Sequence, residues 1–398
     1  MRVLAVTQPG AGHFYPMIPT LRCLVEAGHD VHVVSAPRFV ARIEETGFEA
    51  VGAGLDFLES EVRTSFPQTR GLAPQELGIW YLNELFADLT VHAMVPDLLA
   101  LAEEHQPDLL LRNDYEFATC IVSERIGIPH ATIGCAFIES GQPMHRHISE
   151  PLAFARSAWG LAPYPTLSML DPHLYLTQAP LEWHDHVPTT ARAIRPDGVT
   201  RSGANPLLDM ADYRPDRPTV YASFGTVHNT TDALFPTLLE GLSDEPLNLV
   251  ITVGRNLDPT TWGAPPSNVI IRRFIPQDLL LPHCDLFINN GSFFTIIGAL
   301  LNAVPVLLCP LCGDQPAGSA RFTGLGFGRM LRQPGRPVPP LTDDIPVFSP
   351  LTVRDSCRRI LRDASCAQRV REGRDALREL PPPSIAVEWL EALAGASR

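Results

Sequence analysis

The sequence predicts an α/β protein built from two doubly wound, Rossmann-like domains that face each other across a cleft. In each half of the chain, short runs of β-branched and apolar residues alternate with amphipathic stretches of helical period. Strands separated by helices imply parallel βαβ units, and such units build a doubly wound sheet. A segment rich in turn and breaker residues, 201–217, lies between the halves and is the expected linker.

The first half, 1–200, opens with the apolar run 2–7, which is typical of a buried strand. The helix expected over 16–28 ends at Gly28, a residue that commonly caps helices at their C-terminus. Residues 141–170 are rich in proline, aromatic residues and histidine, and are expected to form loops with a short helix. The other strands are expected over 29–36, 48–54, 107–113 and 128–134, and the other helices over 37–47, 74–101 and 116–127.

The second half restarts the same alternation and forms the expected domain 218–375. A long helix over 352–380, broken near 364–367, leads to a final helix, and the C-terminal segment 376–398 is expected to cross back to the N-terminal domain. Strands are expected over 219–226, 247–254, 268–274, 285–290 and 304–310, with helices over 232–244, 276–284, 293–303 and 318–326. In such folds the ligand cleft lies at the carboxyl ends of the strands, so the chemistry should lie on the loops that follow them.

Composition narrows the class of protein. Hydrophobic residues make up 45% and charged residues 19%, which suits a soluble globular protein. A net charge of −13 disfavours binding to nucleic acid or to anionic membranes. The N-terminal apolar run is too short for a signal peptide, and we expect no stable membrane insertion. The eight cysteines are scattered, which fits a reduced cytoplasm, and the sequence leaves a homodimer open.

Several strings carry a resemblance to a known family: "PGAGHFYPMIPTLRCLVEAGHDVHVVS", "VYASFGT", "NVIIRRFIPQDLLLPHCDLFI" and "LPPPSIAVEWLEAL". Over nearly its full length the chain resembles the family 1 glycosyltransferases of the glycosyltransferase-B (GT-B) fold. Within them it looks most like the actinobacterial enzymes that decorate macrolides, enediynes and aromatic polyketides. The resemblance implies that the C-terminal domain holds a nucleotide diphosphate sugar and the N-terminal domain holds the acceptor. It also implies inversion at the anomeric carbon by one in-line displacement, with no metal and no other cofactor.

The turn "QPGAGHFYP" follows the first strand and holds the residue that matches the family's base, His13. A neutral imidazole can take a proton from an attacking hydroxyl near neutral pH; the competing interpretation is a local hydrogen bond at the start of a helix. Family enzymes often orient this histidine with an acid at the end of a later strand. Here Asn113 stands at that position beside Asp114, and either one could serve; Asp114 could instead cap the next helix. Gly12 and Phe14 are expected to contact the acceptor.

The expected diphosphate turn departs from the family. The family pattern, roughly His-Gly-Gly-Ser-Gly-Thr, would place small residues at a helix N-terminus, where amide groups and the helix dipole favour anions. In this chain Asn290 replaces the histidine, and the turn continues with Gly291, Ser292, two phenylalanines and Thr295. Phe293 and Phe294 either obstruct the phosphate or fold back and leave the backbone donors open.

Other matches to the family complete the candidate site. On the donor side these are Ser223, Gly225 and Thr226 after a strand, Ile275 and Gln277 where the family packs the nucleotide base, and Asp314 and Gln315 for sugar hydroxyls. Met144, Phe154 and Trp159 either line an apolar acceptor pocket or simply pack. The pairs His145 with His147 and His184 with His186 lie on irregular segments beside prolines, which disfavours a metal site.

The sequence therefore predicts an inverting glycosyltransferase. It would move a sugar from a thymidine or uridine diphosphate (TDP or UDP) carrier to a hydroxyl of a hydrophobic natural product. Two alternatives stay open. The fold could have lost sugar-nucleotide use and perform His13-dependent cyclisation, elimination or acyl transfer, or the chain could be a non-catalytic partner of a working transferase. The altered turn at 290–295 motivates both.

Overall fold

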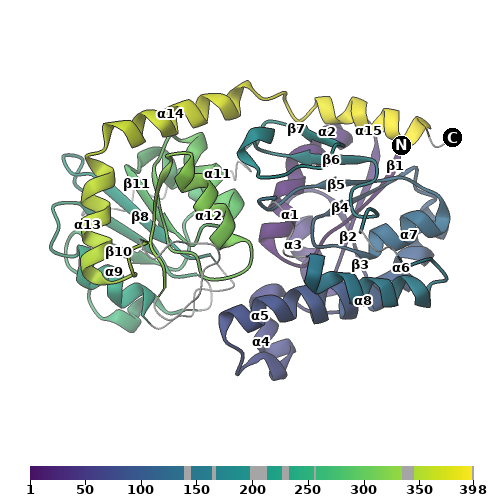
Figure 1. The fold of residues 1–398 in the computed structure, drawn as a ribbon, viewed down its shortest axis with the longest axis horizontal. Coiled ribbons are helices and arrows are strands. Elements are labelled where there is room, and N and C mark those ends of the chain that lie inside the picture. The colour runs from purple at the N-terminus through teal and green to yellow at the C-terminus, as the bar shows by residue number, and fades with distance from the viewer. Residues whose placement is uncertain are drawn as a thin grey trace. The chain divides into compact units, whose positions relative to one another are not determined.

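The computed structural model describes residues 1–138, 145–163, 167–197, 213–225, 233–254, 257–333 and 345–396. The chain divides into two compact units. The first holds Met1–Asp197 together with Leu380–Arg398, and the second holds Gly198–Glu379. Figure 1 shows that both chain ends belong to the first unit. Residues 201–212 of the expected linker lie outside the described residues.

The first unit is built on a parallel sheet of seven strands in the order β3-β2-β1-β4-β5-β6-β7. In its register Ala5 lies between Val33 and Leu111. Because the strand order reverses between β1 and β4, the loops that follow these two strands diverge and can frame a site. The strands are β1 (Arg2–Val6), β2 (Asp30–Ser35), β3 (Glu49–Gly52), β4 (Leu109–Asn113), β5 (His130–Ile133), β6 (Leu174–Thr177) and β7 (Ala191–Ala193).

Helices cover both faces of this sheet (Figure 1). The turn after β1 enters a helix directly, and Gly28 ends that helical run with a φ of +83°. The described helices of the unit are α1 (Ala11–Phe14), η1 (Tyr15–Met17), α2 (Ile18–Glu26), η2 (Pro37–Phe39), α3 (Val40–Glu44), η3 (Glu59–Glu61), α4 (Val62–Ser65), η4 (Pro67–Thr69), α5 (Pro74–Trp80), η5 (Tyr81–Leu89), α6 (Thr90–His105), α7 (Ala118–Ile126), α8 (His145–Ala158), η6 (Leu181–Trp183) and α15 (Ile385–Ala396).

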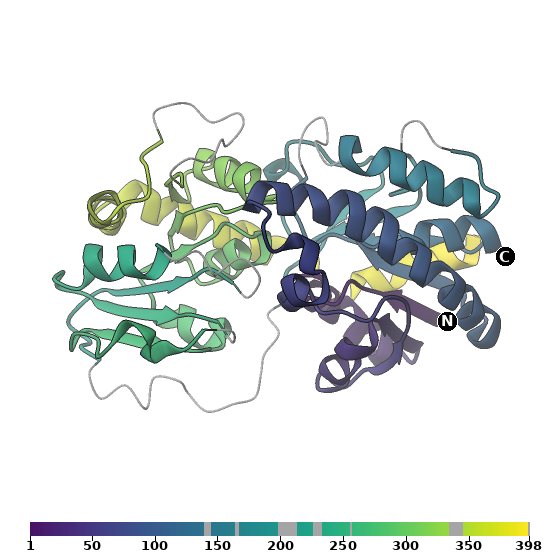
Figure 2. The ribbon, with the colours of Figure 1, turned by 90° about the horizontal axis from the view of Figure 1, so that it is seen from below.

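Three of these helices, α5, η5 and α6, run end to end as one long rod (Figure 2). Its middle part, η5, is a π-helix, a form that is rare at this length. The rod packs on α7 and α8. By length and composition the stretch Glu76–His105 could cross a membrane, but half of its most apolar window is buried inside the unit, as in the core helix of a globular protein.

The C-terminal helix α15 packs on the first unit, beside α2. The Nε2 atom of His29 lies 3.1 Å from the carboxylate of Glu391 on α15. The guanidinium of Arg192 stacks over the ring of Trp389 at 5.0 Å. A polar contact and a cation–π contact therefore supplement the apolar face of this helix.

The second unit holds a parallel sheet of six strands in the order β10-β9-β8-β11-β12-β13. Its order reverses between β8 and β11, so the loops after these strands frame the corresponding site of this unit. At the sheet edge, a Cβ atom on Gly328 would come within 1.8 Å of the Val306 carbonyl oxygen, so only glycine fits there. The strands are β8 (Thr219–Ser223), β9 (Asn248–Thr252), β10 (Val269–Arg272), β11 (Leu286–Asn289), β12 (Val306–Leu308) and β13 (Gly328–Met330).

A broken helix pair leads out of the second unit. Its break lies at Arg362–Asp363, slightly before the expected position near 364–367. Asp363 fixes the break because its carboxylate accepts a hydrogen bond from the Cys366 amide and so caps the following helix. The described helices of the unit are α9 (Leu234–Leu242), η7 (Pro259–Trp262), α10 (Gln277–Leu280), η8 (Leu281–His283), α11 (Phe293–Leu301), α12 (Gln315–Gly324), α13 (Pro350–Leu361) and α14 (Ala364–Glu379).

Candidate active site

His13 lies in α1, directly after the turn that follows β1. Its Nε2 atom is 2.9 Å from a carboxylate oxygen of Glu59, and the two side chains are only 11% and 10% exposed. The imidazole edge also meets the rings of Phe86 and Tyr115, with centroids 5.8 and 5.3 Å away. The ring is therefore held in one orientation by a carboxylate and by aromatic walls.

Glu59 reaches this position because the chain has no side chain at Gly10. A Cβ atom on Gly10 would lie 1.8 Å from Oε2 of Glu59. The backbone of Glu59 is fixed as well, since its amide donates to the Pro9 carbonyl and its carbonyl accepts from the Tyr81 hydroxyl. Sequence reasoning missed Glu59, because nothing distinguishes it from the neighbouring acids Asp56 and Glu61.

The prediction that Asn113 or Asp114 orients His13 is wrong in this structure. The amide of Asn113 donates to Thr7 Oγ1 and its oxygen accepts from the Tyr115 amide, so it ties the ends of β1 and β4 together. The carboxylate of Asp114 accepts from the Cys135 amide at 2.6 Å. Both side chains are thus engaged in fixing the loops, and Glu59 contacts the imidazole in their place.

The alternative interpretation of Asp114, a cap for the following helix, is also wrong. The carboxylate of Glu116 fills that role and accepts from the amides of Ala118 and Thr119. Burial raises the pKa of Glu116, and these hydrogen bonds together with the nearby Arg112 guanidinium act in the opposite direction. Glu116 is therefore a buried structural acid of the β4–α7 connection.

Cys135, in the loop after β5, lies on the other side of the imidazole. Its Sγ atom is 3.6 Å from Nδ1 of His13. A carboxylate can only accept hydrogen bonds, so Nε2 donates to Glu59, and in the neutral imidazole Nδ1 then holds the lone pair. The basic nitrogen of His13 is therefore the one that faces Cys135.

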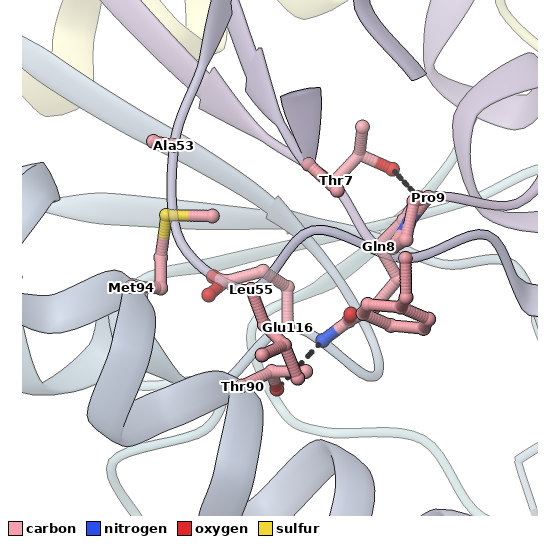
Figure 3. A pocket seen from close by; sticks show the side chains of 10 residues that line it. Thr7, Gln8, Pro9, Ala53, Leu55, Thr90, Met94 and Glu116 are labelled. Atoms are coloured by element: carbon pink, nitrogen blue, oxygen red, sulfur yellow. Dashed lines mark hydrogen bonds between the residues drawn. The ribbon is translucent and has the colours of Figure 1, made fainter. Parts of the chain in front are cut away.

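A small hollow lies behind the His13 turn (Figure 3). Its interior is about the size of a single water molecule, which is far too small for a macrolide-sized acceptor. The side-chain amide of Gln8 crosses it to Thr90 and also donates to the Tyr115 carbonyl. The hollow thus belongs to the packing that supports the turn. Its lining residues are Thr7, Gln8, Pro9, Ala36, Ala53, Leu55, Phe57, Thr90, Met94 and Glu116.

The structure contradicts two of the expected acceptor contacts, those of Phe14 and Trp159. The ring of Phe14 is fully buried in the core, where it meets Phe39 and Phe48 edge-on. Phe154 is 68% exposed, and its ring contacts His92 on the rod. Trp159 follows the end of α8 and does not lie near the His13 turn.

The position of Trp159 follows from the direction of α8. Near the end of that helix, Arg156 pairs with Glu124, which lies near the end of α7. Helix α7 runs back along the parallel sheet, so its end lies at the edge where the strands begin. His13 lies at the other edge, where β1 ends. Gly12, by contrast, is exposed, with open space where a Cβ atom would be. Met144 lies outside the described residues.

His184, one of the four histidines considered for a metal site, has structural partners. His184 contacts Thr177 Oγ1 through Nε2 at 2.8 Å and accepts from the Ile138 amide through Nδ1. Within the described part of the chain, no group of three or more potential metal ligands is found.

In the second unit, the turn between β11 and α11 is the expected diphosphate turn. Gly291 has a φ of +82°, and a Cβ atom there would lie 2.1 Å from Ser319 Oγ on α12. The Gly291 amide donates to Asn289 Oδ1. Asn290 donates to the carbonyl of Phe224 in the loop after β8, so one of its two amide hydrogens is used within the protein. The turn is thus fixed to β8 and α12.

The two phenylalanines of this turn do not point the same way. Phe293 is 2% exposed and packs against Phe322 of α12, inside the core of the unit. Phe294 is half-buried and meets the Phe293 ring edge-on. Because Phe293 folds back, it does not fill the space in front of the helix N-terminus.

The N-cap residue of α11 does not cap the helix. Ser292 Oγ bonds to Thr295 Oγ1 at 2.6 Å, and no side-chain hydrogen bond from Ser292 reaches a first-turn amide. Helix N-termini carry amide groups without intrahelical partners, so this end of α11 can accept an anion. This is the property that a diphosphate site requires.

Polar residues in β8, at the end of β9 and after β10 form a second cluster. The hydroxyl of Tyr221 bonds to Thr252 at 2.9 Å and also to Ser223 and Gln277. Burial raises the pKa of Tyr221, so the hydroxyl stays protonated and can donate. Gly225 has a φ of +75°, which permits the tight turn after β8. Ile275 is buried, and Thr226 lies outside the described residues.

Asp314 and Gln315 stand at the start of α12. The amide oxygen of Gln315 accepts from the backbone amides of Leu311 and Cys312, which leaves only its amide nitrogen to meet a ligand. Asp314 is half-buried at the N-cap position. The expected sugar contact of Gln315 is therefore reduced to the donors of its NH2 group.

Comparison with known proteins places the chain in a family. Residues 22–151 match the erythromycin biosynthesis protein CIII-like N-terminal domain, and residues 202–331 match the UDP-glucoronosyl and UDP-glucosyl transferase family. The chain is 26% identical to 10-deoxymethynolide desosaminyltransferase of Streptomyces venezuelae, covering 100% of this chain and 98% of that one. It is 27% identical to 4'-demethylrebeccamycin synthase of Lentzea aerocolonigenes, covering 83% and 88%.

Solved structures agree on the fold. Glycosyltransferase VinC in complex with DTDP superposes with a TM-score of 0.76 at 24% identity, covering 100% of both chains. The spinosyn rhamnosyltransferase SpnG complexed with spinosyn aglycone has a TM-score of 0.78 at 21% identity, covering 98% of this chain and 100% of that one. The chain thus belongs to the family 1 glycosyltransferases of the GT-B fold. Within that family it is of the actinobacterial natural-product type, with an altered diphosphate-binding turn.

Proposed function

We propose that this glycosyltransferase moves a sugar, with inversion, from a TDP- or UDP-sugar to a hydroxyl of a hydrophobic, polyketide-like natural product. The observation that carries the proposal is the buried His13–Glu59 pair on the loop after β1. Such a pair provides a base and a charge that stabilises the protonated base. The match to 10-deoxymethynolide desosaminyltransferase over the whole chain supports the choice of acceptor class.

In the proposed reaction, the acceptor oxygen attacks the anomeric carbon while the bond from that carbon to the diphosphate breaks. His13 takes the hydroxyl proton on Nδ1, the nitrogen that holds the lone pair. The negative charge of Glu59 then faces a positively charged imidazolium across 2.9 Å. Glu59 is a positioning residue in this scheme, because it acts on the substrate only through His13.

The leaving diphosphate needs stabilisation in the second unit. The N-terminus of α11 supplies amide donors and the positive end of a helix dipole. Ser292 and Thr295 add hydroxyls at the same helix end. Asn290 can add its second amide hydrogen, since the first is bonded to Phe224. Asp314 is proposed to bind sugar hydroxyls, and Ser223, Ile275 and Gln277 the nucleotide.

Further properties follow from the family resemblance and belong to the proposal. The sugar nucleotide would be the only co-substrate, with no metal and no other cofactor. The enzyme would work in the cytoplasm, as a monomer or a homodimer. Neither the comparisons nor the geometry favours cyclisation, elimination, acyl transfer or a non-catalytic role over sugar transfer.

Calorimetric titration with TDP and UDP tests the donor half of the proposal. Because Phe293 is folded into the core, we expect binding of at least one of them with a Kd in the range of about 1 μM to 1 mM that is common for enzyme substrates. Thymidine, which lacks the diphosphate, is the control and should bind much more weakly. If neither diphosphate binds at millimolar concentration, sugar-nucleotide use is refuted.

Glu59→Gln tests the positioning role. The variant keeps the volume of the side chain but replaces a charge-assisted contact to His13 with a neutral one. We expect kcat to fall roughly tenfold, which corresponds to about 1.4 kcal/mol, while the KM for the sugar nucleotide is unchanged. Glu61→Gln is the matched control, because Glu61 lies on the same helix but pairs with the exposed Arg38. Equal kcat values for both variants would refute the role of Glu59.

A further inference from the structure

Cys135, His13 and Glu59 form a line of three interacting side chains. The sulfur is 3.6 Å from one ring nitrogen, and the carboxylate is 2.9 Å from the other. A nucleophile beside a base that is oriented by a third group is the arrangement that activates serine and cysteine nucleophiles. Transfer of a sugar to a hydroxyl does not require the thiol, so its presence here needs a separate explanation.

The position of Cys135 is fixed by its backbone. Its amide donates to the Asp114 carboxylate at 2.6 Å. A Cβ atom on the preceding Gly134 would lie 2.3 Å from the hydroxyl of Tyr175, so the chain passes close to that ring. Cys135 itself is half-buried, which leaves it within reach of a small reagent.

The other cysteines provide a contrast. Burial raises the pKa of Cys120 and Cys357 to about 12, which keeps them as inert thiols. Cys120 has a histidine neighbour too, His130 at 3.8 Å, but both residues are buried and burial lowers the pKa of His130 to about 3. Cys23 is half-buried like Cys135, yet burial and the nearby Glu26 raise its pKa. Cys135 therefore combines exposure with an imidazole that can accept its proton.

We propose that Cys135 is a nucleophilic thiol activated by His13 and Glu59, and that it forms a covalent adduct with α,β-unsaturated carbonyl compounds. In this addition the sulfur forms a bond to the β-carbon, and the electron pair of the carbon–carbon double bond moves onto the carbonyl system. His13 takes the thiol proton and returns it to the α-carbon. The adduct keeps all atoms, and no oxidant or reductant is consumed.

This reactivity shares His13 and Glu59 with the proposed sugar transfer, but it does not depend on that transfer taking place. The adduct forms on the Cys135 sulfur, 3.6 Å from the His13 nitrogen that the transfer reaction is proposed to use, so the two reactions exclude one another. A natural product that carries an unsaturated ketone would then act as an inactivator as well as a candidate acceptor.

Labelling with N-ethylmaleimide, itself an α,β-unsaturated imide, tests the proposal on the full-length chain. Peptide mass spectrometry gives the rate for each cysteine separately, and Cys23 serves as the internal reference. We expect Cys135 to react at least about tenfold faster than Cys23, since thiolate content sets the rate. Rates for Cys135 that are equal to or below those for Cys23 would overturn the proposal.

Two variants distinguish activation of the Cys135 thiol by His13 from simple solvent exposure of that thiol. Glu59→Gln and His13→Gln should each slow the labelling of Cys135 by roughly tenfold and leave Cys23 unchanged. The buried Cys120 and Cys357 should remain unlabelled in every variant, which shows that the chain is folded. If Cys135 reacts as fast in both folded variants as it does in the wild type, its reactivity owes nothing to His13 and the proposal fails. Because adducts are read by mass, this result is independent of whether sugar transfer occurs.

Discussion

Replacement of His13 by alanine is expected to lower kcat by about 10²–10⁴-fold, the range for loss of a general base. The acceptor hydroxyl would have to lose its proton to water instead of to an oriented imidazole. The affinity for TDP should be unchanged, because the expected nucleotide residues lie in the other unit. Steady-state kinetics of sugar transfer, combined with calorimetry of nucleotide binding, would measure the two effects separately.

His92→Ala is a matched control for this variant. His92 is also in the first unit and also lies beside an acid, Asp88, at 3.3 Å, but its side chain is 34% exposed and its ring contacts the exposed Phe154. Its removal should change kcat by less than about twofold, as for most surface substitutions. If His13→Ala retained full kcat, His13 would be only a local structural residue of the turn, and the proposed mechanism would be wrong.

Gly291→Ala is expected to weaken TDP binding by roughly tenfold or more. The φ of +82° costs about 1–2 kcal/mol for a residue with a side chain. The added methyl group would also lie 2.1 Å from Ser319 Oγ, so the turn must move away from α12. Because the amides at the start of α11 follow that turn, they would no longer converge on the diphosphate. Calorimetry gives the affinity, and thermal unfolding reports the loss of stability.

Two further variants identify the cause of that effect. Gly324→Ala, in α12 with open space around its Cβ position, should bind TDP like the wild type. Adding Ser319→Gly to Gly291→Ala removes the clash but keeps the strained backbone, so binding should recover in part. Wild-type affinity in the Gly291→Ala single variant would show that the diphosphate does not use this turn.

The sequence predicted the fold where the pattern of apolar residues was long and regular. Strands such as β1 and β8 and the helices α2 and α11 were expected close to their observed bounds. It missed β6, β7 and β13, which are three or four residues long. Such short segments carry too little alternation to be distinguished from loops, and they become strands because neighbouring strands offer hydrogen bonds. The short helix expected within 141–170 is the longer α8.

The residues of the candidate site were predicted less completely from the sequence than the fold was. His13 was found because its turn resembles a known motif, but its partner Glu59 comes from a loop 46 residues away. Chain position alone does not give the direction of a side chain, and so Asn113 and Asp114 were wrongly paired with His13. The orientation of Phe293 was likewise undetermined until the packing of α12 was known.

The path of the chain from Ala53 to Glu61 has a consequence for engineering. This loop lies outside the sheet, and it places Glu59 over a glycine of the His13 turn. An exchange of the loop with that of a relative, made to alter acceptor preference, would also replace the acid that supports the base. Chimeras of this kind would lose turnover even with a well-fitting acceptor unless the incoming loop carries a carboxylate at the same place. In the proposed mechanism, turnover therefore depends on this short segment as well as on the His13 turn.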